Sequence, residues 1–275
     1  METSIKQEYF VNKILQRLED ESEGILAQWE RPEGTSTRHF FLDKFLPKSD
    51  VDEIYAAFPR NGKGFFDRES FREKKRESAD LSNFNAVLSD ITYAIQDPRV
   101  VTQIAELCSM NNLEPDPKLY AGGLSMMFPN DYLNPHIDNS HDRDRNKYRR
   151  LNLLHYVSPD WALDNGGNFE LWDDGRATPK TIISHQNRFV VMETNKTSWH
   201  SVSQVNAERP RCCVSNYYFS ENSPDGDEYF HVTSFLGRPN QRIRSYIGVL
   251  DNGLRNFVSR TLKIGRGKNL VNKDS

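Results

Sequence analysis

Apolar residues recur at helical spacing through the first part of the chain. The positions that share this spacing between residues 3 and 29 are Ile5, Phe10, Ile14, Leu18, Ile25 and Leu26. Charged residues separate them, and Pro32 and Gly34 follow. The pattern predicts one amphipathic helix that ends before the proline.

Shorter elements are predicted over the next eighty residues. A strand is predicted at 39–42, and helices are predicted over 50–58, 83–96 and 98–109, the first of them stopped by Pro59. Residues 60–80 are rich in charge and glycine and show no periodicity. We expect a mobile loop there.

The pattern changes at residue 119, where short β-rich runs begin to alternate with turn residues. The runs are Leu119–Phe128, Arg150–Val157, Asn168–Trp172, Arg188–Glu193, His200–Val205 and Cys212–Phe219. Several short strands at this spacing predict a sandwich or barrel. Helical spacing returns over Arg242–Lys263. We therefore expect an α+β fold of one structural domain, with a helical region 1–118, a β-rich core 119–222 and an extension 223–275.

Composition and charge narrow the class of protein. The chain has 275 residues, 16 Phe and 11 Tyr, and a net charge of -3. The aromatic content indicates a packed core, and the charge gives no reason to expect a nucleic-acid partner. Residues 238–275 carry nine basic and two acidic side chains, a net of +7, against -10 for the rest.

The basic, amphipathic segment 242–263 fits two interpretations. We favour a helix packed on the β-rich core, and the alternative is weak contact with an anionic membrane surface or a partner. The three cysteines, Cys108, Cys212 and Cys213, make a poor disulfide framework, and no run is long enough for a membrane span. A cytoplasmic location is the simplest expectation, with a peripheral membrane location as the variant. The oligomeric state stays open.

Two histidines and one aspartate are candidate metal ligands. In His136-Ile137-Asp138, residues i and i+2 of a strand point the same way, so both side chains can reach one ion. His200 lies 64 residues further on, beside Trp199. Separately, such residues are more often surface or packing residues. Together they form the facial triad that suits Fe(II) with open coordination positions.

Arg211 begins a predicted strand on which Arg211, Cys213, Ser215 and Tyr217 share one face. An inward guanidinium needs a carboxylate partner, because a buried unpaired charge is costly. A dicarboxylate co-substrate would supply one with bidentate geometry. The alternatives are an internal acidic residue or a solvated strand end.

Residues 119–219 resemble the catalytic core of the prolyl-4-hydroxylase-like family of 2-oxoglutarate/Fe(II) dioxygenases. The features that carry the resemblance are, in order, Phe128-Pro129, His136-Ile137-Asp138, Leu154-His155-Tyr156, Asp160-Trp161, Gly166-Gly167, Phe169–Trp172, His200-Ser201-Val202 and Arg211–Phe219. The resemblance implies a double-stranded β-helix, or jelly-roll, buttressed by the N-terminal helices and followed by a C-terminal helical extension.

The resemblance also assigns roles. His136, Asp138 and His200 would hold Fe(II), and Arg211, with Tyr156 and Ser215, would bind 2-oxoglutarate. O2 is the second co-substrate, succinate and CO2 are products, and ascorbate is a candidate stimulant. Asp138 favours hydroxylation, since related halogenases have a small residue there. The chain departs from some relatives, which have Lys at Arg211 or Tyr at Phe128. Arg209 is a second, less favoured candidate for the carboxylate.

The substrate is open. It is a small molecule, a glycan- or lipid-linked group, or a protein side chain, and a peptidyl prolyl 4-hydroxylase is the first alternative. A non-catalytic jelly-roll metal-binding protein and a zinc hydrolase are the others. Residues 139–150 are strongly charged and are expected to be solvated, or else to meet an acidic substrate. Trp161 and Trp172 would line a substrate groove or pack in the core.

Overall fold

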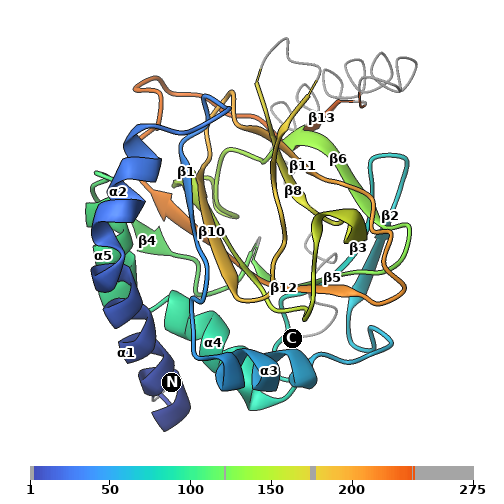
Figure 1. The fold of residues 1–275 in the computed structure, drawn as a ribbon. Coiled ribbons are helices and arrows are strands. Elements are labelled where there is room, and N and C mark those ends of the chain that lie inside the picture. The colour runs from blue at the N-terminus through green and yellow to red at the C-terminus, as the bar shows by residue number, and fades with distance from the viewer. Residues whose placement is uncertain (1–2, 121, 174–177, 237, 239–275) are drawn as a thin grey trace.

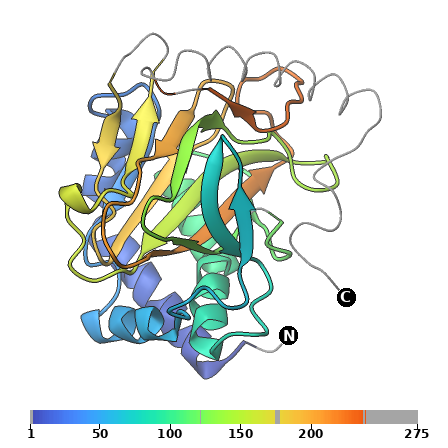
Figure 2. The same cartoon turned by 90° about the vertical axis from the view of Figure 1, so that its right-hand side faces the viewer.

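The computed structural model describes residues 3–120, 122–173, 178–236 and 238, and Figure 1 shows the fold. Its helices are α1 (Ile5–Asp20), α2 (Ser22–Glu30), α3 (Lys48–Ala57), α4 (Ala86–Ile95), α5 (Pro98–Leu107) and the short 3-10 helix η1 (Leu163–Asn165). Helices α1–α5 lie together on one side of a curled β-sheet, and η1 lies apart from them (Figure 1 and Figure 2).

The strands form two antiparallel layers. The first layer has the order β1 (His39–Leu42), β10 (Arg188–Glu193), β7 (Tyr148–Tyr156), β12 (Arg211–Ser220) and β5 (Gly123–Met127). The second has the order β6 (Tyr132–Ile137), β11 (Trp199–Val202), β8 (Phe169–Trp172) and β9 (Lys180–Ile182). β3 (Glu73–Ser78) pairs with both β5 and β6 and so joins the layers. Three short strands pair at the edges: β2 (Phe66–Glu69), β4 (Glu114–Pro115) and β13 (Ser234–Phe235).

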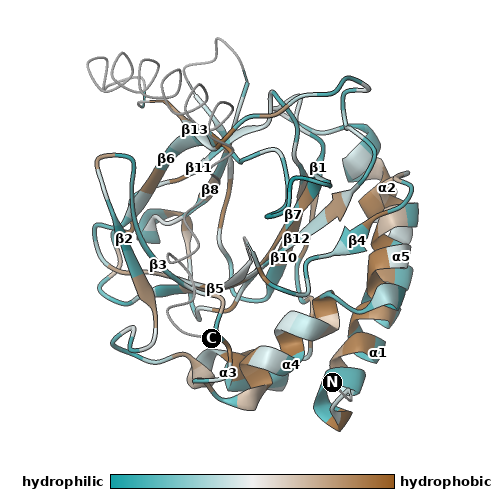
Figure 3. Cartoon of the chain, turned by 180° about the vertical axis from the view of Figure 1, so that it is seen from behind, coloured by the Kyte–Doolittle hydropathy of each residue, from teal (hydrophilic) through white to brown (hydrophobic). Residues whose placement is uncertain are grey.

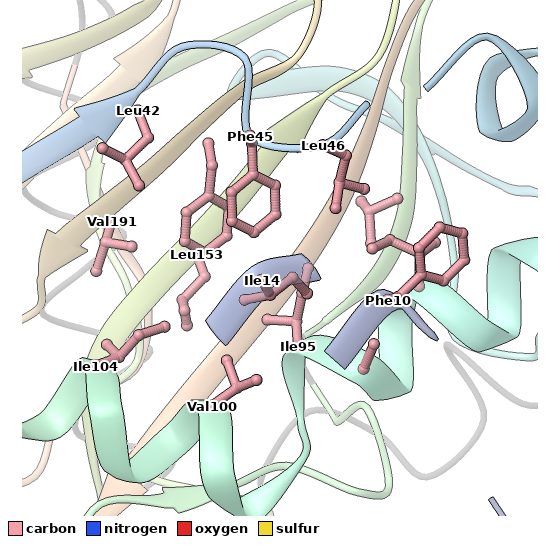
Figure 4. Close-up of a cluster of buried hydrophobic side chains, with 14 of the residues drawn as sticks. Phe10, Ile14, Leu42, Phe45, Leu46, Ile95, Val100, Ile104, Leu153 and Val191 are labelled. Atoms are coloured by element: carbon pink, nitrogen blue, oxygen red, sulfur yellow. The ribbon is translucent and has the colours of Figure 1, made fainter. Parts of the chain in front are cut away.

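Alternation along the strands of the first layer gives it two buried faces. On β10, Phe189 and Val191 belong to the core shared with the helices, whereas Val190 and Met192 belong to the core between the layers. This follows from the two-residue repeat of a strand. Figure 4 shows the helix side, where Ile14 and Ile104 lie near Val191. The first layer is therefore held between the helices and the second layer.

The helices bury one apolar face each. Phe10, Val11, Ile14 and Leu18 of α1 are buried, while charged residues cover its other side. Seen from behind in Figure 3, α1, α4 and α5 carry both hydrophobic and hydrophilic residues, as expected of helices with one buried face. The N-terminal helices thus buttress the sheet as predicted.

Two predictions of secondary structure and one prediction of burial need correction. The single helix over 3–29 is two helices, because Glu21 leaves the helical conformation at φ -106° and ψ 11°. Ile5, counted on its apolar face, is 92% exposed. The prediction of a loop over 60–80 is wrong, because this range contains the hairpin β2–β3. The hairpin has no alternation of apolar and polar residues, and ion pairs across it, such as Arg76–Asp67 at 2.6 Å, stabilise it instead.

The predicted C-terminal helix over 242–263 lies outside the described residues. Within the described part of the chain, no helix has the length and apolar character needed to cross a membrane.

Candidate metal centre

The three predicted ligands meet between two neighbouring strands of the second layer. His136 lies on β6, Asp138 directly follows that strand, and His200 lies on β11, where it is the register partner of His136. Their candidate ligand atoms all lie within 4.8 Å of one another. Among the described residues, this is the group of His, Cys, Asp or Glu side chains that could hold a metal ion. Strand pairing thus brings together residues 64 positions apart.

The backbone orients both imidazoles. His136 Nδ1 lies 3.0 Å from the carbonyl oxygen of Asn134, and His200 Nδ1 lies 2.9 Å from that of Ser198. With Nδ1 donating to a carbonyl, Nε2 is left as a lone-pair donor. Each Nε2 lies 3.6 Å from a carboxylate oxygen of Asp138. The two histidines therefore present metal-binding nitrogens toward Asp138.

The electrostatics keep the ligands in the protonation states that a metal requires. Burial would raise the pKa of Asp138, but the Arg149 guanidinium and the two histidines hold that pKa well below its usual range. Burial, together with His136, lowers the pKa of His200 to about 3. A carboxylate and a neutral imidazole are both ready to bind a cation near neutral pH.

The triad opens into a pocket between the two layers. Its walls include Arg149, Asn152, Leu154, Phe169, Arg211, Ser215, Thr233 and Phe235. The ring of Phe235 on β13 stacks on His136, with the centroids 5.3 Å apart. Glu73, Lys75 and Glu77, alternate residues of β3, complete the wall at the junction of the layers. Two of the predicted co-substrate residues, Arg211 and Ser215, therefore share this pocket with the metal ligands.

Arg211 is buried without an acidic partner. Its side chain is 3% exposed, and among the residues that the structure describes no carboxylate lies within ion-pairing distance of it. Nη1 contacts the sulfur of Met127 at 3.0 Å, a weak acceptor, and Nε has no hydrogen bond. The sequence alternatives of an internal acid or a solvated position do not describe this residue. An anionic ligand would satisfy it.

Tyr156 lies against this guanidinium. Arg211 Cζ is 4.9 Å from the centre of the Tyr156 ring. The hydroxyl is buried, and burial raises the pKa of Tyr156 to about 12 although the Arg211 charge lowers it, so the group remains a donor. Tyr156 is not itself part of the pocket wall. Its predicted role in co-substrate binding stays a prediction, as does that of Ser215.

The Gly166-Gly167 pair allows the chain to pass close to the site. Gly167 has φ +61°, and a Cβ there would lie 2.9 Å from Arg211 Cδ. A Cβ on Gly166 would lie 1.9 Å from the carbonyl oxygen of Gln204. Trp161 donates its indole N–H to the Gly166 carbonyl at 2.8 Å and is 2% exposed. The backbone of this motif therefore packs closely against the side chain of Arg211 and supports it.

Other candidates from the sequence lie elsewhere. Arg209 donates to the carbonyl of Asp160 at 2.8 Å, outside the pocket wall, which favours Arg211 as the carboxylate binder. Trp172 is buried and donates to Ser201 Oγ at 2.8 Å, so both Trp161 and Trp172 are packing residues. Arg149 was missed because it was counted in a solvated charged segment, whereas it is 2% exposed.

Comparisons with known proteins agree with this geometry. Residues 122–219 match the model of the 2OG-Fe(II) oxygenase superfamily. Two curated relatives are the prolyl 3-hydroxylases of Mus musculus, 31% identical over 96 residues, and of Xenopus laevis, 30% identical over 103 residues. The matches cover 33% and 34% of this chain, but only 17% and 20% of those proteins. The chain thus spans about a fifth of the length of these relatives.

Solved structures show the same fold. The prolyl hydroxylase of Trichoplax adhaerens, solved with a peptide fragment of hypoxia inducible factor, has a TM-score of 0.53 at 16% identity, covering 78% of this chain and 96% of that one. The prolyl-4-hydroxylase of Pseudomonas putida has a TM-score of 0.52 at 14% identity, covering 72% and 97%. The predicted jelly-roll and the predicted resemblance to prolyl-hydroxylase-like 2-oxoglutarate/Fe(II) oxygenases are confirmed.

Proposed function

We propose that the chain is an Fe(II)- and 2-oxoglutarate-dependent dioxygenase that hydroxylates its substrate. The overall reaction consumes 2-oxoglutarate, O2 and a substrate C–H bond, and yields succinate, CO2 and the hydroxylated product. The observation that carries the proposal is the buried guanidinium of Arg211, which has no acidic partner in the described part of the chain and shares a pocket with the His136, Asp138 and His200 triad.

The donor set fits the metal. Two imidazole nitrogens and one carboxylate on one face of a pocket are typical of non-haem Fe(II) oxygenases. When bound, Fe(II) supplies the chemistry that activates dioxygen and consumes 2-oxoglutarate. The alternatives are less well supported. A structural metal site is normally closed by four ligands, and three come together among the described residues. A zinc hydrolase would leave the buried charge of Arg211 without a partner.

The residues of the chain contribute binding, orientation and exclusion of water. Arg211 would bind the distal carboxylate of 2-oxoglutarate through paired N–H donors, which also fixes the orientation of the co-substrate. The Tyr156 hydroxyl, whose pKa burial raises to about 12, would stay protonated and would donate a hydrogen bond to the same group. Phe169, Leu154 and Phe235 give the pocket apolar walls that limit access of water to the reacting groups.

The test is release of CO2 from C1-labelled 2-oxoglutarate by the Fe(II)-loaded chain. We expect turnover by the wild type, none by His136→Ala, and a strongly raised KM for 2-oxoglutarate in Arg211→Ala. Arg209→Ala is the matched control, because this neighbouring arginine bonds to backbone carbonyls outside the pocket. Equal KM values for the two arginine variants would refute the role of Arg211.

A peptidyl prolyl substrate is the second candidate. Its support is the similarity of 96 residues of this chain, 31% identical, to a prolyl 3-hydroxylase, and the hairpin β2–β3 beside the pocket, which leaves Phe66 and Phe71 each 40% exposed. Exposed aromatic residues beside a pocket suit contact with an extended chain. Succinate release measured with a proline-containing peptide library, against the same peptides with alanine for proline, tests this candidate. Equal stimulation by both sets would reject it.

A further inference from the structure

Arg149 is the second buried cation of the pocket and, unlike Arg211, it has an acidic partner. Its Nη1 lies 3.2 Å from Asp138 Oδ2, and its Nη2 donates to Asn139 Oδ1 at 2.8 Å. The guanidinium also lies over the ring of Tyr217, with Cζ 4.1 Å from the centroid. Three contacts, from strand β12 and from the loop that follows β6, therefore hold one 2% exposed side chain in place.

Both oxygens of Asp138 can face a metal ion. Oδ1 lies 3.6 Å from His136 Nε2, and Oδ2 lies 3.6 Å from His200 Nε2. Nothing in the spacing to the histidines prefers one oxygen over the other. An ion between the three side chains would therefore be bound by one or by both oxygens, unless another group occupies one of them.

The number of donor atoms from Asp138 matters for the proposed reaction. A bound Fe(II) would keep open positions for the co-substrates if each of the three side chains gave it one atom. A second oxygen from Asp138 would occupy a position that 2-oxoglutarate or dioxygen requires.

We propose that Arg149 reserves Oδ2 of Asp138, so that the carboxylate gives the metal a single oxygen and leaves room for 2-oxoglutarate to chelate. This inference rests on the function proposed above. Arg149 is a positioning residue, because it acts through Asp138. An arginine suits the task, since its planar fork places Nη1 in an ion pair with Oδ2 while Nη2 donates to Asn139, and the plane stacks on an aromatic ring, whereas lysine offers a single flexible point charge.

The experiment separates metal binding from co-substrate binding. Dissociation constants are measured by calorimetry on the full chain, without oxygen, first for Mn(II) and then for 2-oxoglutarate added to the metal-loaded protein. In Arg149→Met, which keeps the apolar contact with Tyr217 but has no donors, we expect the constant for 2-oxoglutarate to rise at least about 10-fold. The constant for Mn(II) should stay equal or fall, because the released oxygen is free to bind.

Three further variants test the result. Arg150→Gln is the matched control, since Arg150 is the next residue on β7 and donates to the carbonyl of Asn222 at 3.2 Å; both constants should stay at wild-type values. Arg149→Lys keeps the charge and should give an intermediate 2-oxoglutarate constant. If Arg149→Met does not fold, Asn139→Ala removes the second anchor of Arg149 and should weaken 2-oxoglutarate binding to a smaller extent.

The outcomes are distinct. Unchanged 2-oxoglutarate binding in every Arg149 and Asn139 variant overturns the inference. Parallel loss of Mn(II) and 2-oxoglutarate binding also overturns it, because Arg149 would then support the whole site. Failure of the wild type to bind 2-oxoglutarate overturns the proposed function itself.

Discussion

Replacing Arg211 by methionine should abolish co-substrate binding without weakening the folded protein. The reason is that the Arg211 side chain is 3% exposed and its Nη1 donates to a methionine sulfur, a weak acceptor. Burying this charge costs desolvation free energy that no ion pair among the described residues offsets. Such a charge is therefore better explained by ligand binding than by stability of the fold. A ligand-free protein should therefore tolerate its removal.

The magnitude follows from two opposing effects. Replacing buried charged groups with apolar residues of similar volume is often neutral or stabilising by about 1–4 kcal/mol. The contact of Arg211 with the Tyr156 ring at 4.9 Å offsets this, since a desolvated cation–π contact contributes up to about 2 kcal/mol. We expect the free energy of unfolding of Arg211→Met to lie between no change and a gain of about 2 kcal/mol.

The assay is thermal unfolding with and without 2-oxoglutarate, in the presence of Mn(II). At a concentration of about 100 times its Kd, the ligand should stabilise the wild type by about 2.7 kcal/mol, which raises Tm by several degrees. Arg211→Met should show no such rise. Arg188→Met is the control, because Arg188 is also buried but pairs with Asp43 at 2.7 and 2.8 Å; it should lower Tm.

The reasoning is refuted if Arg211→Met lowers the ligand-free Tm by as much as Arg188→Met does. Arg211 would then be a structural residue, and its burial would say nothing about a ligand. It is also refuted if 2-oxoglutarate stabilises Arg211→Met as strongly as it stabilises the wild type.

Three other predictions concern the support of the site, pH and the C-terminal segment. Gly167→Ala places a Cβ 2.9 Å from Arg211 Cδ at φ +61°. It should lower the free energy of unfolding, measured with urea, by about 1–2 kcal/mol and raise the KM for 2-oxoglutarate. An unchanged KM contradicts the supporting role of the glycine. Burial lowers the pKa of His155 to about 4, so the unfolded chain binds the extra proton as pH falls from about 6.5 toward 4 and stability is lost over that window. His155→Leu should remove about 2 kcal/mol of the difference in unfolding free energy between pH 7 and pH 5, and an unaltered difference would exclude this histidine as its source. The alternative kept for the basic segment after residue 238, weak contact with an anionic membrane, predicts that co-sedimentation with phosphatidylserine vesicles exceeds that of a chain ending at residue 238. Equal binding rejects this alternative and leaves the favoured one, a helix packed on the core.

Much of the site could be predicted because its chemistry depends on residue type and strand periodicity. His136 and Asp138 point the same way from one strand end, and Arg211 and Ser215 share a strand face, so the sequence alone placed them together. The long-range pairing of His200 with His136 came from the resemblance, because no local rule predicts which strands become neighbours.

The residues that were missed owe their role to tertiary structure. Arg149 looked like part of a solvated charged run, and only the fold shows that it is buried against Asp138 and Tyr217. The hairpin β2–β3 is stabilised by ion pairs and by the pairing of β3 with β5 and β6. Its sequence therefore needs no alternation of apolar and polar residues, and without that pattern the sequence predicts a loop. Phe235 lies far along the chain from His136, and nothing in its neighbours indicates that it stacks on a metal ligand.

The most direct test of the proposed function is the visible absorption of the anaerobic protein loaded with Fe(II) during titration with 2-oxoglutarate. Chelation of Fe(II) by the keto acid produces a metal-to-ligand charge-transfer band, which requires both the triad and an open pair of positions. We expect the band in the wild type, its loss in His136→Ala and a weaker band in Arg211→Ala. Full metal loading of the wild type without any band at saturating 2-oxoglutarate would contradict the assignment of this pocket as a dioxygenase site.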